Sequence, residues 1–85
     1  MKTIYKYEFK EGSVEMPIGA NILTIEDQDG RLHIWAIVDT DAESEFRYFA
    51  IVGTGQDFPE ADEVNYINTI QDSPFVWHIF ELIDK

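Results

Sequence analysis

The sequence predicts an all-β protein, a small antiparallel meander of six to seven strands that forms a sandwich or a partly closed barrel. Apolar and polar residues alternate with a period of two along most of the chain, which is typical of strands with one buried face. Turn-forming residues interrupt this alternation at short intervals. No window shows the sustained period of about 3.6 residues expected of an amphipathic helix. The 85 residues predict a single domain, residues 1–85, because so short a chain cannot divide its core.

Seven segments carry the strand pattern: residues 3–9, 14–16, 21–26, 31–39, 45–52, 64–70 and 75–82. Pro17 ends the second segment, and Gly19 permits the turn that follows. Asp29-Gly30 predicts a tight hairpin, because this pair readily adopts positive φ. Residues 56–63 read as an acidic loop, in which Pro59 favours a single helical turn over residues 59–64.

Two of the predicted strands are apolar on both faces. In residues 31–39 one face carries Leu32, Ile34, Ala36 and Val38, and the other carries His33, Trp35 and Ile37. In residues 45–52 one face carries Phe49 and Ile51, and the other carries Phe46, Tyr48, Ala50 and Val52. Either the sheet folds back on itself to bury both faces, or a second copy covers the remainder in a homodimer or higher homo-oligomer.

The charge balance is strongly acidic, with 17 Asp and Glu against 6 Lys and Arg, a formal net charge of −11. Such a surface repels nucleic-acid phosphates and anionic membranes, so direct nucleic-acid or membrane binding is not expected. The acidity can serve solubility alone. Alternatively, it can imitate nucleic acid or dock on a basic protein. No cysteine, secretory leader or membrane-length apolar run is present, which favours a cytoplasmic location.

Gly53-Thr54-Gly55 raises the question of a phosphate-binding loop. A dinucleotide fingerprint needs a third glycine where this chain has Phe58, followed by a helix, and a Walker loop needs a Lys-Ser/Thr ending. We therefore expect a corner or bulge that requires positive φ, and keep phosphate binding as the alternative.

Metal and catalytic patterns are weak. The acids that alternate from Asp39 to Glu45 lack the glycine and glutamate of a calcium loop. His33 and His78 have no metal-ligand spacing and no nucleophile paired with them, so we expect structural roles. The sequence predicts no catalytic residue, no metal site and no cofactor.

Aromatic side chains are too numerous for so small a core to hide. They make up 14% of the residues, and Tyr and Trp combine apolar area with a polar group suited to interfaces. We expect some of them to be exposed. Arg31 and Arg47 could supply positive charge to a compact ligand pocket beside this aromatic surface.

Five segments, MKTIYKYEF, VEMPIGANIL, LHIWAIVD, FAIVGTG and FVWHIFE, resemble in order a family of small accessory proteins encoded by tailed phages and prophages. The resemblance covers nearly the whole chain. It implies phage origin, action inside a bacterium and a non-structural accessory role, and it carries no assigned activity or catalytic residues.

Three functions follow as hypotheses, none of them enzymatic. The first is a stoichiometric inhibitor of a host component, above all of antiviral defence, which would bind through Asp57, Phe58, Glu60, Asp62 and Glu63. The second is a sponge for a nucleotide-derived immune signal in pockets between subunits, with ligand contacts from Gly53, Thr54, Gly55, Arg31, Trp35, Arg47 and Tyr48. The third is a minor virion or morphogenesis component.

Overall fold

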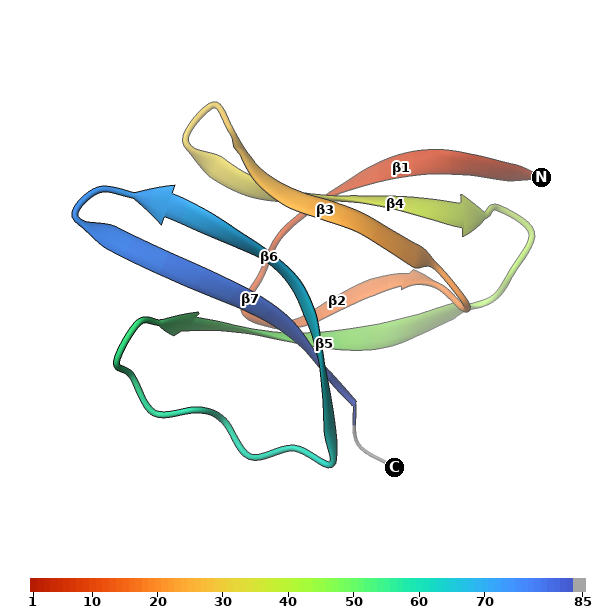
Figure 1. The fold of residues 1–85 in the computed structure, drawn as a ribbon. Coiled ribbons are helices and arrows are strands. Elements are labelled where there is room, and N and C mark those ends of the chain that lie inside the picture. The colour runs from red at the N-terminus through yellow and green to blue at the C-terminus, as the bar shows by residue number, and fades with distance from the viewer. Residues whose placement is uncertain (84–85) are drawn as a thin grey trace.

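The computed structural model describes residues 1–83, which form seven antiparallel strands in two sheets (Figure 1). The three-stranded sheet has the order β1-β4-β3 and the four-stranded sheet the order β2-β5-β7-β6. The strands are β1 (Lys2–Glu8), β2 (Gly12–Pro17), β3 (Asn21–Gln28), β4 (Arg31–Asp39), β5 (Ser44–Gly53), β6 (Glu63–Asp72) and β7 (Phe75–Ile83). The predicted all-β sandwich is confirmed.

The order of the strands within the sheets is not the sequential order of a simple meander. Only β3–β4 and β6–β7 are neighbours both in the chain and in a sheet. The chain passes from one sheet to the other between β1 and β2, returns between β2 and β3, and passes back between β4 and β5. The alternation in the sequence identifies which segments are strands and which of their faces are buried. It contains no information on which strands pair when they are distant in the chain.

The β3–β4 hairpin forms where the Asp-Gly pair predicts it. Asp29 and Gly30 have φ values of 56° and 83°, which suit the right-handed twist of the two strands. The Asp27 carboxylate accepts a hydrogen bond of 2.9 Å from the Gly30 amide. Local sequence therefore determines this turn.

The core lies between the two sheets. Ile25, Ile34, Ala36 and Ile79 are completely buried there, and Phe49 is 2% exposed. The inward face of β4 is the one that carries Ile34 and Ala36, whereas His33 and Trp35 point away from the core. The predicted alternation along this strand is confirmed.

One side chain joins the open edges of the two sheets. Asn68 of β6 accepts a hydrogen bond of 3.0 Å from the Ile25 amide and donates one of 2.7 Å to the Ile25 carbonyl. A register irregularity in β6 between Tyr66 and Asn68 accompanies this contact. The side-chain amide of Asn68 thus pairs with the backbone of edge strand β3 as one residue of a neighbouring strand would.

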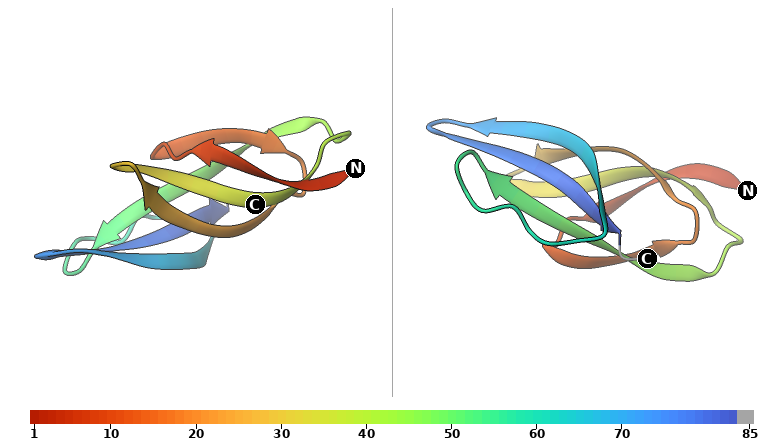
Figure 2. Two further views of the ribbon diagram at one scale, coloured as in Figure 1. Left: turned by 90° about the horizontal axis from the view of Figure 1, so that it is seen from above. Right: turned by 60° about the horizontal axis from the view of Figure 1, so that its bottom comes forward.

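The loop that connects β5 to β6 crosses the outer face of the four-stranded sheet (Figure 2, right). The loop has to pass β7, which lies between the two strands that it connects, and the core occupies the inner side of the sheet. Residues 57–61 are irregular and β6 begins at Glu63. The helical turn expected over residues 59–64 is therefore wrong, because the chain is extended here to span β7.

Candidate functional site

The outer face of the four-stranded sheet carries apolar side chains that do not belong to the core between the sheets. Side chains on this face form rows across β5, β7 and β6 because paired residues of antiparallel strands share a face. The rows are Tyr48–Leu82–Val64, Ala50–Phe80–Tyr66 and Val52–His78–Thr69. This face is therefore apolar and aromatic at its centre, although the core packs against the opposite side of the same sheet.

The β5–β6 loop covers part of this face through Phe58. The Phe58 ring packs edge-to-face on Phe80 with 4.9 Å between centroids, and the Tyr66 ring packs edge-to-face on Phe80 at 5.6 Å. Ala50 and Val52 are buried, yet both lie outside the core cluster between the sheets. The loop and the aromatic rings thus build a second, smaller apolar layer outside the sandwich.

Much of this layer remains exposed. The exposed fractions are 56% for Phe46, 52% for Tyr48, 50% for Phe58 and 59% for Tyr66. We call Phe46, Tyr48, Phe58, Tyr66, Phe80 and Leu82 the aromatic face. A contiguous exposed group of large apolar side chains on a small protein is a common mark of an interaction site.

A chain of polar groups borders the aromatic face. The His78 ring lies between two hydroxyls, with its Nε2 atom 2.9 Å from Thr54 Oγ1 and its Nδ1 atom 3.1 Å from Thr69 Oγ1. The Tyr66 hydroxyl lies 2.6 Å from the same Thr69 oxygen. These contacts fix the start of the β5–β6 loop against β7 and orient Tyr66, which agrees with the structural role predicted for His78.

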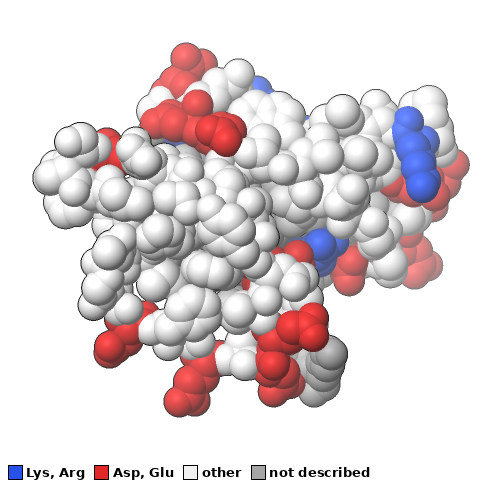
Figure 3. All heavy atoms as spheres, in the orientation of Figure 1, with Lys and Arg blue, Asp and Glu red and all other residues white. Residues whose placement is uncertain are grey.

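The rim of the aromatic face is acidic. Glu15 stands opposite Phe46 in the register of β2 and β5, and the loop adds Asp57 and Glu60. Figure 3 shows acidic groups along the lower border of the molecule, where this loop runs. Arg47 is the only Lys or Arg in the four strands of the sheet. The face therefore combines apolar rings with negative charge.

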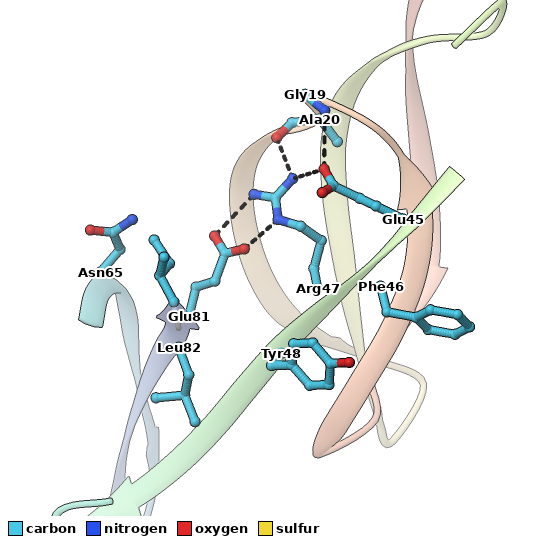
Figure 4. A pocket seen from close by; sticks show the side chains of 10 residues that line it. Gly19, Ala20, Glu45, Phe46, Arg47, Tyr48, Asn65, Glu81 and Leu82 are labelled. Atoms are coloured by element: carbon cyan, nitrogen blue, oxygen red, sulfur yellow. Dashed lines mark hydrogen bonds and ion pairs between the residues drawn. The ribbon is translucent and has the colours of Figure 1, made fainter. Parts of the chain in front are cut away.

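Arg47 points inward and is held by an ion pair. Its guanidinium donates two hydrogen bonds to the Glu81 carboxylate and one of 2.9 Å to the Ala20 carbonyl (Figure 4). Glu45 lies 3.8 Å from the same guanidinium and accepts a bond from the Gly19 amide. Glu81 is 8% exposed, and its hydrogen bonds raise the pKa of Arg47 above its ordinary value, with further attraction from Glu45 opposing the cost of burial.

This ion pair lines a hollow of about 490 Å³, but it leaves little positive charge for a ligand. Two carboxylates surround one guanidinium, so the net local charge is negative. Figure 4 shows Phe46 and Tyr48 directed away from the guanidinium. We interpret the Arg47–Glu81 pair as a structural element that fixes β5 against β7 and the β2–β3 turn.

The residues predicted to bind a nucleotide do not gather in one place within the chain. Arg31 pairs with Glu8 at 3.4 Å in the three-stranded sheet, and Trp35 lies on the outer side of that sheet. Arg47 and Tyr48 lie in the other sheet and point to opposite sides of β5. The strand from Arg47 to Gly53 spans roughly 20 Å at about 3.3 Å per residue.

The Gly53-Thr54-Gly55 turn uses its amides internally. The Gly53 amide donates to the Gln56 side chain at 2.8 Å, the Thr54 amide to the Val76 carbonyl, and the Gln56 amide to the Gly53 carbonyl. Gly55 has a φ of 88°, as expected of the predicted corner. Gly53 has another reason to be glycine, because a Cβ would lie 3.0 Å from the ring of Trp77.

The residues predicted to bind a protein partner lie together at the β5–β6 loop and the start of β6. Phe58 joins the aromatic face, and Asp57 and Glu60 are exposed beside it. Asp62 and Glu63 follow at the entry to β6, each exposed and each with a contact within the protein. The sequence reasoning missed Phe80 as the centre of this face, although the alternation of β7 places it opposite Ile79 and Glu81.

Metal clusters and membrane-spanning helices are both absent from residues 1–83. No three His, Asp or Glu side chains in this part of the chain are arranged to hold a metal ion. The same described residues contain no helix long and apolar enough to span a bilayer.

The fold and this face define a small all-β domain of the two-sheet sandwich class with an exposed aromatic patch. The chain belongs to the family described as Domain of unknown function (DUF7352), whose model matches residues 1–85. No curated protein and no solved structure matches the chain. The resemblance to phage accessory proteins stays a prediction.

Proposed function

We propose that this protein is a non-enzymatic, stoichiometric binding protein that docks a basic protein partner on the aromatic face. The observation that carries the proposal is that exposed rings and acidic groups occur together on one sheet face. Tyr and Phe side chains provide the buried centre of an interface, and charges at its rim select the partner. The partner should therefore present apolar side chains surrounded by Lys and Arg.

Charge favours a different protein over a second copy of this one. A two-fold dimer through the aromatic face would place the acidic rim of one copy, with Glu15, Asp57 and Glu60, against the equally acidic rim of the other copy. The formal net charge of −11 adds general repulsion to this local one. A basic partner would replace this repulsion with attraction.

The phage resemblance suggests what the partner would be. A small protein that binds stoichiometrically would act by blocking a host component, and a component of antiviral defence is the one we propose. Expression of the protein should then restore phage plating on cells that carry the relevant defence system. The Tyr48→Lys variant should fail to restore plating while remaining folded.

Peptide selection tests the docking surface and does not require that the partner be identified first. A random peptide library would be displayed and selected on the immobilised protein, and synthetic peptides would be measured by calorimetry. We expect selected sequences to combine aromatic or aliphatic residues with Lys or Arg. Their affinity should fall at least tenfold for Tyr48→Lys, which places a positive charge within the aromatic face, and should fall as salt is raised.

Ile4→Lys is the matched control. Ile4 is 56% exposed and lies on the outer side of the three-stranded sheet, so this variant adds the same charge on the opposite side of the sandwich. It should leave peptide affinity nearly unchanged. Selected peptides that are acidic, or that bind both variants equally, would contradict the proposal.

A further inference from the structure

The β3–β4 and β6–β7 hairpins lie at the same end of the sandwich (Figure 1). A groove opens between the two sheets at this end. Its volume is about 590 Å³, within the range of roughly 300–1,000 Å³ typical of small-molecule sites. It lies on the inner side of the four-stranded sheet, so it is separate from the aromatic face.

The floor of the groove is apolar and comes from four strands. Leu32 of β4, Ile51 of β5, Ile70 of β6 and Trp77 of β7 line it, and all four side chains are only half-buried. Ile70 and Trp77 are paired across β6 and β7, and Trp77 is paired with Gly53 of β5. The core of the sandwich is therefore not closed at this end, and it leaves apolar surface open to a ligand.

Trp77 is held in place before any ligand arrives. The Phe75 ring stacks on it with 5.6 Å between centroids and 27° between planes. Gly53 allows the close approach of the indole, and the Gln56 side chain is fixed by its bond to the Gly53 amide. A rigid indole loses little conformational freedom on binding and attracts a cation to its ring face.

The rim of the groove is anionic. Glu11, Asp27 and Asp72 line it, and among the described residues 1–83 no Lys or Arg does. The Glu11 carboxylate accepts a hydrogen bond from the Ile51 amide, and Asp27 accepts one from Gly30, so both are oriented by the backbone. Figure 3 shows acidic groups at the top of the molecule, where the β3–β4 hairpin lies.

We propose that this groove binds a small organic amine, with its apolar body on Leu32, Ile51, Ile70 and Trp77 and its ammonium group at the carboxylate rim. The apolar floor provides contact area, and the three carboxylates select a positive charge. The same rim disfavours phosphate and carboxylate ligands. The groove is thus a second binding site, independent of protein docking on the outer face.

The test is an NMR titration with phenethylamine, with phenylacetate as the anion of matched size. The indole N–H signal of Trp77, assigned with a Trp35→Phe variant, reports on the groove. We expect a saturable shift with the amine and an affinity at least about fivefold weaker for phenylacetate, corresponding to roughly one favourable charge contact.

Asp72→Asn and Glu43→Gln form a matched pair of variants. Both remove one exposed carboxylate, but Glu43 lies in the β4–β5 connection at the other end of the sandwich. Asp72→Asn should weaken the amine severalfold, and Glu43→Gln should leave it nearly unchanged. No saturable shift of Trp77, equal affinity for amine and anion, or equal effects of the two variants would each overturn the proposal.

Discussion

The Arg47–Glu81 pair provides the sharpest prediction about stability. Arg47→Met removes the guanidinium and leaves the Glu81 carboxylate, whose side chain is 10% exposed, without its partner. Breaking a buried pair in this way costs about 3–5 kcal/mol. A domain of 85 residues has a total stability of about 4–13 kcal/mol, at roughly 0.05–0.15 kcal/mol per residue. The variant should therefore lose a large part of the stability of the fold.

Urea unfolding followed by tryptophan fluorescence measures this loss, with the free energy extrapolated linearly to water. The double variant Arg47→Met, Glu81→Leu serves as the control, because replacing both partners by apolar residues removes the unpaired charge. We expect the double variant to recover most of the lost stability. A loss below about 1 kcal/mol for Arg47→Met, which is typical of exposed ion pairs, would refute the reasoning. A double variant as unstable as the single one would refute it as well.

Three further predictions concern other contacts. Asn68→Leu should cost about 2–3 kcal/mol in urea unfolding and speed amide exchange in β3, because it leaves the Ile25 backbone without partners; unchanged exchange would contradict this. Phe58→Ser should make the β5–β6 loop sensitive to limited proteolysis while costing only about 1 kcal/mol of global stability, since one aromatic pair is lost; resistance equal to the wild type would count against the packing. Asp39 should titrate in NMR below its ordinary pKa of 3.8, because the Asp41 amide and the N-terminal ammonium bond its carboxylate. Its contribution to stability should be present above pH 3.8 and be lost as the pH falls through the lower pKa of the folded state. An Asp39→Asn variant whose stability falls at acidic pH in the same way as that of the wild type would disprove it.

Much of the fold follows from local patterns in the sequence. Alternation identified the seven strands and separated the inward Ile34 from the outward Trp35, and the Asp29-Gly30 pair located the hairpin. These features depend on neighbouring residues alone, which is why they can be read without the structure. The two-sided apolar pattern of β5 likewise indicated a second apolar surface, and the aromatic face occupies it.

The remaining features depend on contacts between distant residues. Arg47 and Glu81 are 34 positions apart, and Asn68 and Ile25 are 43 apart, so no periodicity could pair them. The Arg47 guanidinium, which the sequence suggested as a ligand contact, is thus engaged by a carboxylate within the protein. The helical turn expected after Pro59 failed because the position of β7 between β5 and β6 determines the path of the loop.

The most direct test of the docking face is the amide chemical-shift map of the protein with a peptide selected on it. We predict that the shifts cluster on Tyr48, Tyr66 and Phe80 and on the loop around Phe58, and that Asp57→Lys together with Glu60→Lys abolishes them at equal peptide concentration. Shifts that cluster instead on the outer side of β1, β4 and β3, or that survive the charge reversal, would contradict the assignment of the aromatic face as the docking surface.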